Sequence, residues 1–197
     1  MIINPKTAVE NGWIVFPDSY DADQIKKHMQ PNGIDFTLDR LWLVDSFTSA
    51  FISEDKRIFK PTTEVSGLKM YAECGDDNDY FTIHQNNSYD FMSNMKVSLP
   101  AGVCAMLIVR SSLNRVAVGL TSGLFDAGFN GNIAGHLRSF AGSVIIAKGT
   151  RVGQIIFHYA SQSNDESDLY TGIYNNKDGY WKDGVMMSAD PHENPTN

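Results

Sequence analysis

The sequence has little that would mark a secreted, metal-stapled or membrane-spanning protein. Only two of its 197 residues are cysteines, Cys74 and Cys104, and neither has the CxxC or Cys/His spacing of a zinc site. A reducing, cytoplasmic environment is therefore expected, because disulfide frameworks need several paired cysteines. No segment approaches the roughly 20 apolar residues of a membrane helix, and the first residues do not resemble a secretion signal. We expect no membrane association.

Positive charge is also scarce. The chain has 16 Lys and Arg residues against 23 Asp and Glu, which gives a formal net charge of −7. Nucleic-acid affinity comes from clustered Lys and Arg side chains, so we expect no nucleic-acid partner, although a local basic pocket for a small phosphate ligand is compatible with this balance. The 42% of apolar residues can bury one sizeable core. One domain over residues 1–197 is predicted, with the Ser-, Asn-, Asp- and Gly-rich residues 160–197 as a mobile tail.

Helical patterns are few, and short strand-like runs dominate. The best helix candidate is Asp21–Met29, which Asp21 or Asp23 could cap and Pro31 would end. Asn130-Gly131 in particular predicts a hairpin turn. A mainly β, antiparallel fold with one or two short helices follows. The predicted runs, each bounded by turn residues, are Gly33–Leu38, Leu41–Phe47, Phe51–Ile52, Gly67–Tyr71, Tyr80–His84, Met95–Leu99, Gly102–Val109, Val116–Leu120, Ile133–Leu137, Ser143–Ala147 and Val152–Tyr159.

Two strand positions carry side chains suited to phosphate. Arg110-Ser111-Ser112 directly follows an apolar strand, where a guanidinium, two hydroxyls and free backbone N–H groups suit phosphate oxygens. The alternative is a surface strand end whose serine caps a short helix starting at Leu113. Gln154 follows Gly153 at the start of another strand, where its amide either reaches a ligand or faces solvent.

Asp126 is a carboxylate presented by a turn beside the aromatic Phe129. In that place it could accept a hydrogen bond from a sugar hydroxyl or activate water as a general base. The alternative is an ordinary turn aspartate.

Read together, four segments resemble the motifs of the dUTPase/dCTP deaminase superfamily. RSSLNR at Arg110–Arg115 is similar to the second motif, GLFDAGFNG at Gly123–Gly131 to the third, and GTRVGQ at Gly149–Gln154 to the fourth. QPNGIDFTL at Gln30–Leu38 resembles the first, with Asp35 at its acidic position. The resemblance is specific because several separated motifs occur in the family's order and spacing.

The resemblance implies a fold, a substrate and an assembly. The fold is the dUTPase-type antiparallel, distorted β-barrel or jelly-roll-like domain, and the substrate is a deoxynucleoside triphosphate. Three subunits form a homotrimer with sites at their interfaces. Mg²⁺ binds mainly through the triphosphate, with Asp35 as a water-mediated partner. The chain length and the segment Tyr170–Tyr174 resemble dCTP deaminases more than the shorter dUTPases.

The resemblance also implies a role for each phosphate-side position. Arg110, Ser111 and Gln154 hold phosphates. Ser112 supports the phosphate site, and Arg115 adds positive charge near the reacting centre.

On the sugar side, Asp126 positions the deoxyribose and orients the water that attacks the α-phosphorus. Phe129 packs against the sugar, and backbone groups from about Gly123 to Asn132 read the base. The tail from Tyr170 to Lys177, which includes Tyr174, closes over the triphosphate as a lid, with Lys177 as a phosphate contact. The alternative for this segment is a solvated tail.

One position departs from the deaminase pattern. Family deaminases use a glutamate on the strand after the third-motif turn, where this chain has His136. This favours a pyrophosphatase that converts dUTP to dUMP and pyrophosphate. Three alternatives remain. His136 acts as a base in a dCTP deaminase, or it is only a packed or hydrogen-bonded histidine. In the third, the chain, which lacks the glycine-rich fifth motif, is a non-catalytic nucleotide-binding regulator.

Overall fold

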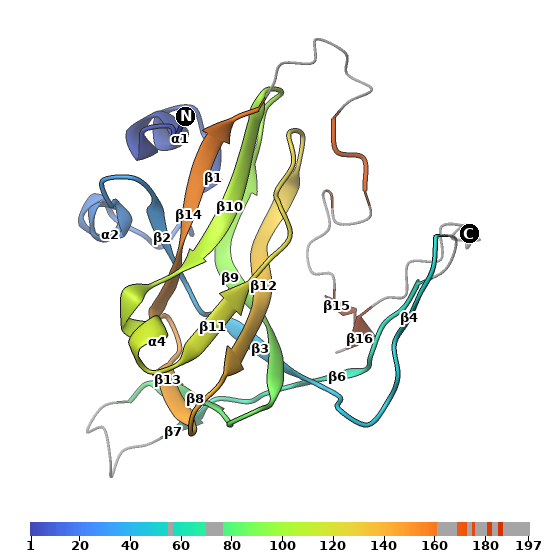
Figure 1. Ribbon diagram of the computed structural model, residues 1–197. Coiled ribbons are helices and arrows are strands. Elements are labelled where there is room, and N and C mark those ends of the chain that lie inside the picture. Colours follow the sequence, from blue (N-terminus) through green and yellow to red (C-terminus); the bar gives the residue numbers. More distant parts are fainter. Residues whose placement is uncertain are drawn as a thin grey trace.

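The computed structural model describes residues 1–54, 57–69, 77–160, 169–172, 175, 181–182 and 185–186. In this part of the chain, three short helices accompany an otherwise β structure: α1 (Pro5–Glu10), α2 (Ala22–His28) and α4 (Ser111–Arg115) (Figure 1). None of the described helices is long and apolar enough to span a membrane. The mainly β, antiparallel fold with few helices is thereby confirmed. Most of the predicted tail, 160–197, lies outside the described residues.

The strands form three main sheets and two small ribbons. The strands are β1 (Ile14–Val15), β2 (Ile34–Thr37), β3 (Arg40–Val44), β4 (Phe51–Ile52), β5 (Arg57–Ile58), β6 (Thr62–Glu64), β7 (Leu68–Lys69), β8 (Asp79–Ile83), β9 (Ser88–Ser98), β10 (Val103–Val109), β11 (Val118–Thr121), β12 (Asn130–Ser139), β13 (Val144–Ala147), β14 (Arg151–Tyr159), β15 (Trp181–Lys182) and β16 (Val185–Met186). The largest sheet has the order β11-β12-β9-β3-β6, with β1 on β9, and the others are β10-β14-β2 and β13-β8-β7. The ribbons are β4-β5 and β15-β16.

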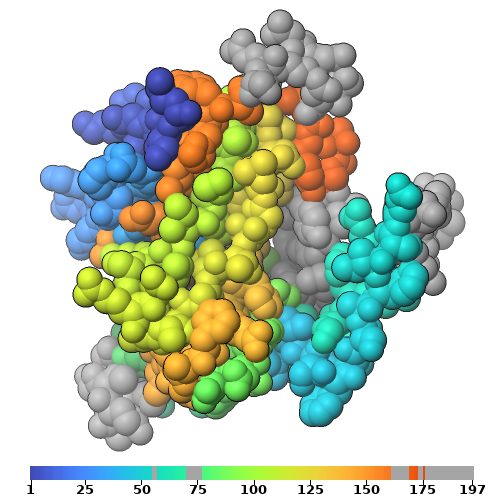
Figure 2. Space-filling view, in the orientation of Figure 1, coloured from blue at the N-terminus to red at the C-terminus, as the bar shows by residue number. Residues whose placement is uncertain are grey.

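Every predicted run overlaps one of these strands, but several elements were missed. β1, β5 and β6 are too short to produce a pattern. The first half of β9 was missed because it follows a polar stretch and itself contains several polar residues. The β4-β5 ribbon projects from the main sheets, as the cyan segment of Figure 2 shows. It exposes Phe51 and Ile52.

The core joins the β10-β14-β2 sheet to the largest sheet. The rings of Phe36 on β2 and Phe91 on β9 stack with their centroids 5.7 Å apart and an interplanar angle of 3°. Both are fully or almost fully buried, and burying such a side chain stabilises the fold by about 1.5–3 kcal/mol. Gly153 on β14 lies against Phe36 because it has no Cβ. Gly153 and Phe36 are also direct partners in the pairing of β14 with β2, so the Phe36 ring lies over a neighbouring strand that carries no side chain there.

Helix α2 forms where the sequence predicts it. Asp21 is its N-cap and makes a capping box with Gln24: each side chain accepts a hydrogen bond from the other residue's backbone N–H at 2.8 Å. Asp21, rather than Asp23, is therefore the cap. The helix ends before Met29, two residues ahead of Pro31.

Two local predictions are wrong. The turn lies at Ala127-Gly128, where Gly128 has φ +86°, and Asn130-Gly131 instead begins β12, paired with β9. Pairing with a long neighbouring strand outweighs the local turn preference of Asn-Gly. The helix after β10 begins at Ser111, not at Leu113, and its N-cap Arg110 makes no side-chain cap hydrogen bond.

Candidate active site

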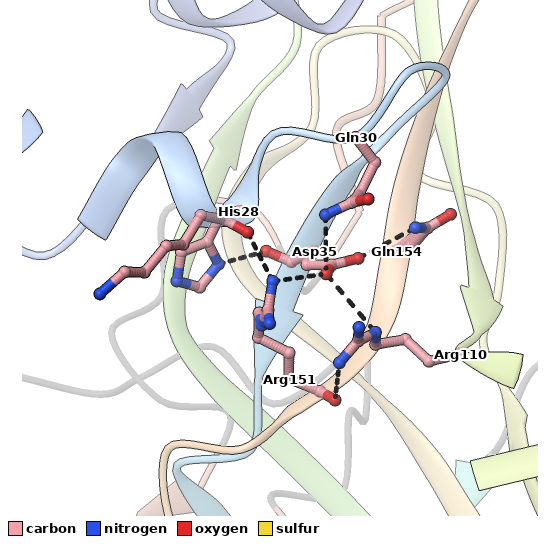
Figure 3. Close-up of polar contacts among 7 residues, drawn as sticks. His28, Gln30, Asp35, Arg110, Arg151 and Gln154 are labelled. Carbon is pink, nitrogen blue, oxygen red and sulfur yellow. Dashed lines mark hydrogen bonds and ion pairs between the residues drawn. The ribbon is translucent and has the colours of Figure 1, made fainter. Parts of the chain in front are cut away.

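A buried carboxylate gathers side chains from three separate segments of the chain. Asp35 on β2 is 0% exposed. Its Oδ1 accepts a hydrogen bond from Gln154 Nε2 at 3.0 Å, and its Oδ2 accepts from Gln30 Nε2 and Arg151 Nη1, each at 3.2 Å (Figure 3). Arg110 Nε completes the group with an ion pair to Oδ2 at 3.4 Å. We call these five residues the Asp35 cluster.

Strand register brings the cluster together. Gln154 on β14 lies between two partners, Asp35 on β2 and Ile108 on β10. Arg110 comes directly after β10, and its backbone N–H donates to the Val152 carbonyl at 3.1 Å. The predicted convergence of the second and fourth motifs is thus a consequence of β10 and β14 running side by side.

The C-terminal end of α2 makes hydrogen bonds with two members of the cluster, Asp35 and Arg151. His28 Nδ1 lies 2.6 Å from the backbone carbonyl of Asp35, and Arg151 Nη1 donates to the Lys27 carbonyl. Burial lowers the pKa of His28, and the hydrogen bond to the Asp35 carbonyl opposes this only in part. The ring is therefore neutral at neutral pH, and Nδ1 carries the proton because a carbonyl oxygen can only accept. Tyr20 covers the ring, with centroids 5.3 Å apart.

The cluster has an exposed, positively charged side. The side chains of Arg110 and Arg151 are 30% and 35% exposed, whereas Asp35 is inaccessible. Helix α4 begins next to Arg110 and carries Ser111, Ser112 and Arg115, which are all exposed. Leu113 is the buried residue of this helix. Guanidinium groups and hydroxyls in this arrangement suit the oxygens of a phosphate chain.

The surroundings of Asp35 do not fit a role as a magnesium partner. Its carboxylate is fully buried, and each of its contacts is to a hydrogen-bond donor or a cation, so it presents no oxygen to a hydrated ion. In the described ranges, no group of three or more His, Cys, Asp and Glu residues could hold a metal ion.

The Asp126 turn, residues 125–130, is a second and more open group. Asp126 is exposed at a turn that is fastened at both ends: Phe125 and Ala105 exchange two backbone hydrogen bonds of 2.9 Å, and Phe129 O accepts from Leu99 N at 2.8 Å. The carboxylate is thus accessible on a fixed backbone. Gly123 is exposed in the loop that precedes it.

Part of the tail lies on this turn. Tyr170 N donates to Ala127 O at 2.8 Å, and the Asn175 side chain accepts from Asn130 N at 2.7 Å. Phe129 is 8% exposed, and its ring lies 5.7 Å from that of Tyr170. Little of the Phe129 ring is left for a sugar while Tyr170 is in this position. Tyr174 and Lys177, the other predicted tail contacts, lie outside the described residues.

His136 forms a third group, with a partner that the sequence did not reveal. On neighbouring strands β12 and β9 it faces Asp90, and its Nδ1 lies 3.1 Å from Asp90 Oδ1. The two side chains are 34% and 20% exposed. Thr121 on β11 flanks the histidine on its other side. His136 is thus a hydrogen-bonded histidine at a half-buried position of the sheet, and it is not packed in the core.

The structure therefore unites some predicted residues and separates others. Asp35, Arg110 and Gln154 meet in one cluster, but no hydrogen bond or ion pair among the described residues links it to Asp126 or His136. Sequence reasoning missed Arg151 and Gln30, although both belong to quoted motifs. It also missed Asp90, whose only signal is its alternation with apolar neighbours in β9.

Comparison with known proteins identifies relatives. The model of the dCTP deaminase-like family matches residues 12–160. A probable deoxyuridine 5′-triphosphate nucleotidohydrolase of Methanopyrus kandleri is 29% identical over 161 residues, which are 81% of this chain and 92% of the relative. A dUMP-forming dCTP deaminase of Methanococcus maripaludis is 42% identical over 67 residues, which are 33% of this chain and 32% of that one.

A solved structure shares the fold. The 2′-deoxycytidine 5′-triphosphate deaminase from Agrobacterium tumefaciens matches with a TM-score of 0.58 and 16% identity. The match covers 85% of this chain but only 51% of that one, so this chain spans about half its length.

Proposed function

Because the chain belongs to the dCTP deaminase-like family within the dUTPase/dCTP deaminase superfamily, we propose that it is a pyrophosphatase that converts dUTP, or a related pyrimidine deoxynucleotide, to the monophosphate and pyrophosphate. The observation that carries the proposal is Asp126, an accessible carboxylate on a fastened turn, combined with His136 where family deaminases have a glutamate. The carboxylate proposed to activate water, Asp126, is present, whereas the glutamate that family deaminases use is replaced by His136.

In the proposed reaction, the triphosphate lies against Arg110, Gln154 and the hydroxyl of Ser111, and Mg²⁺ bound to its phosphates would balance part of their charge. Asp126 accepts a hydrogen bond from a water molecule and takes its proton as the oxygen attacks the α-phosphorus. The new P–O bond replaces the bond to the β-phosphate, and pyrophosphate leaves with its charge balanced by the guanidinium groups. A positioned base of this kind contributes about 10²–10⁴-fold to a rate.

A homotrimer with intersubunit sites is part of the proposal. Among the described residues of one chain, no hydrogen bond or ion pair links Asp126 to the Asp35 cluster, so a second chain could bring one beside the other. Exposed apolar side chains suit such an interface: Met106 is 40% exposed, Ile108 44% and Leu124 54%. Sedimentation analysis of the purified protein tests this, and a stable monomer that turns over substrate would refute it.

The direct test of the activity is incubation with dUTP, dCTP and dTTP in the presence of Mg²⁺, followed by chromatography and detection of pyrophosphate. We expect dUMP and pyrophosphate in equal amounts from dUTP, because one bond is broken. The proposal fails if no deoxynucleoside triphosphate yields pyrophosphate. Nucleotide binding without any product would instead support a regulator.

A second candidate, deamination of dCTP, is favoured by the His136–Asp90 pair. If Asp90 accepts the Nδ1 proton, the lone pair of His136 lies on Nε2, which can take a proton from water attacking C4 of cytosine. The proton on His136 then passes to the amino group, which leaves as ammonia, while the second water proton passes to N3 as the C4 carbonyl forms. Ammonia release from dCTP that disappears in His136→Ala and falls in Asp90→Asn would support this reading. Release that is undiminished in His136→Ala, or absent from the wild type, excludes it.

A further inference from the structure

Arg151 is a member of the Asp35 cluster to which the sequence assigned no role. Its Nη1 is anchored twice, to Asp35 Oδ2 and to the Lys27 carbonyl. Its Nε and Nη2 make no hydrogen bond within the described part of the chain, and its side chain is 35% exposed. One edge of the guanidinium is therefore fixed, and the other is available to a ligand.

Arg110 is held in the same manner by the same oxygen. Its Nε pairs with Asp35 Oδ2 at 3.4 Å, and its Nη1 donates to the backbone carbonyl of Arg151 at 3.3 Å. In Figure 3 the two guanidinium groups lie on one side of Asp35, with Gln30 on the opposite side. Asp35 thus bridges two cations that would otherwise repel each other.

The charge balance of this group points to an anionic ligand. Two guanidinium groups face one carboxylate, so one positive charge is uncompensated, and it is on the exposed side because Asp35 is fully buried. Guanidinium forks bind phosphate oxygens through paired N–H groups, which lysine cannot reproduce. Side chains that are already anchored lose less conformational freedom when a ligand binds.

We propose that Arg151 is a second phosphate-binding arginine and that Asp35 is the positioning residue that holds it beside Arg110. The ligand is an oligophosphate, which carries several charges along its chain and can engage both guanidinium groups. The assignment of this ligand to a substrate triphosphate rests on the proposed function. The buried Asp35 carboxylate acts on the phosphates through the arginines and does not bind a metal ion.

The first test is calorimetric titration of the intact protein with inorganic tripolyphosphate. We expect Arg151→Gln to weaken binding by roughly tenfold or more, because the charge-assisted hydrogen bonds of the guanidinium fork are lost. Arg151→Lys should be intermediate, because it keeps the charge and loses the fork. Arg138→Gln is the matched control, since Arg138 is an exposed strand arginine that contacts the Phe140 ring instead. Equal affinity in wild type and Arg151→Gln would overturn the proposal.

The second test separates positioning from simple electrostatics. Asp35→Asn removes one negative charge beside the two arginines, so a purely electrostatic role of Asp35 predicts tighter binding of tripolyphosphate. A positioning role predicts weaker binding, by about tenfold if two long side chains must be ordered again. Tighter binding would overturn the role of Asp35. Should Asp35→Asn fail to fold, the double variant Arg110→Gln/Arg151→Gln replaces it: we expect its loss of affinity to differ from the product of the two single losses, and strict additivity would refute the shared anchoring.

These outcomes are independent of the proposed reaction. If tripolyphosphate binding depends on Arg151 but no deoxynucleotide is hydrolysed, the proposed function fails and the phosphate site stands. If dUTP is hydrolysed with the same KM by wild type and Arg151→Gln, the phosphate site fails and the proposed function stands.

Discussion

The Asp35 cluster and the Asp126 turn are built in opposite ways. Asp35 is 0% exposed and receives donors from three segments, so its neighbours are held before any ligand arrives. Asp126 is exposed, and only the backbone of its turn is fastened. The carboxylate that orders other side chains is buried in the core, whereas the carboxylate proposed to contact water is accessible to it.

This difference indicates how each region should respond to change. Replacing the Asp126 side chain removes chemistry with little effect on folding, because that side chain is exposed. A substitution behind the Asp35 cluster disturbs folding first and ligand binding as a consequence. Four variants, each with a matched control, test whether this division holds.

The largest effect is expected from Asp126→Asn. The amide cannot take a proton from water, so kcat for pyrophosphate release from dUTP should fall about 10²–10⁴-fold. The free energy of unfolding should change by less than about 0.5 kcal/mol, because the side chain is exposed. Steady-state kinetics and urea unfolding measure the two quantities. Asp18→Asn, at another exposed turn, should change neither. Undiminished activity in Asp126→Asn would remove the proposed role.

The next largest effect is expected from Gly153→Ala, which acts on folding. An added Cβ would lie 2.6 Å from Phe36 Cε1, and Phe36 cannot move easily because it is buried and stacked on Phe91. Overpacking of this kind costs about 1–3 kcal/mol in the free energy of unfolding. Urea unfolding measures it. Gly123→Ala is the control, since a Cβ added at Gly123 would have nothing within 4 Å. Equal stabilities would show that β14 can shift away from Phe36.

A smaller effect is expected from Gly128→Ala in the Asp126 turn. Gly128 has φ +86°, which costs an alanine about 1–2 kcal/mol, and its Cβ would lie 2.8 Å from Leu169 Cβ. Gly142→Ala has a similar φ of +68° with nothing within 4 Å, so it reproduces the strain without the contact. Both should lose stability in thermal unfolding, but only Gly128→Ala should alter KM for dUTP. Identical KM values would mean that residues 169–170 do not influence the site.

Secondary-structure elements were predicted from the sequence better than the side-chain contacts between them. The capping residue Asp21 and the stop at Pro31 are local signals, and α2 forms between them. Arg110 and Gln154 were expected to meet because family motifs imply it. The donors around Asp35 depend on the register of β2 against β14, which no local pattern encodes.

The same reason explains the other errors. The Asn130-Gly131 pair carries a strong turn signal, yet β12 already begins there because β9 offers a long pairing edge. His136 was recognised as a departure, but its partner Asp90 lies 46 positions away in the sequence and is adjacent only across two strands. Contacts of this kind become visible only in the folded chain.

The smallest effect is expected from Asp21→Ala, which tests whether α2 supports the Asp35 cluster. Loss of the N-cap should lower the free energy of unfolding by about 1 kcal/mol. Asp23→Ala is the control, because Asp23 lies in the same first turn while Asp21 remains the cap. A comparable loss in Asp23→Ala would mean that helix charge, not capping, is responsible.

The consequence for ligand binding follows from the far end of the same helix. Its last turn supplies the Lys27 carbonyl to Arg151 and the His28 ring to the Asp35 carbonyl. Fraying should therefore weaken tripolyphosphate binding by less than about threefold, well below the effect of Arg151→Gln, because only part of the capping energy is transmitted along the helix. Calorimetry on Asp21→Ala measures this change. A stability loss with unaltered binding would place α2 outside the phosphate site and leave Asp35 alone to hold the two arginines.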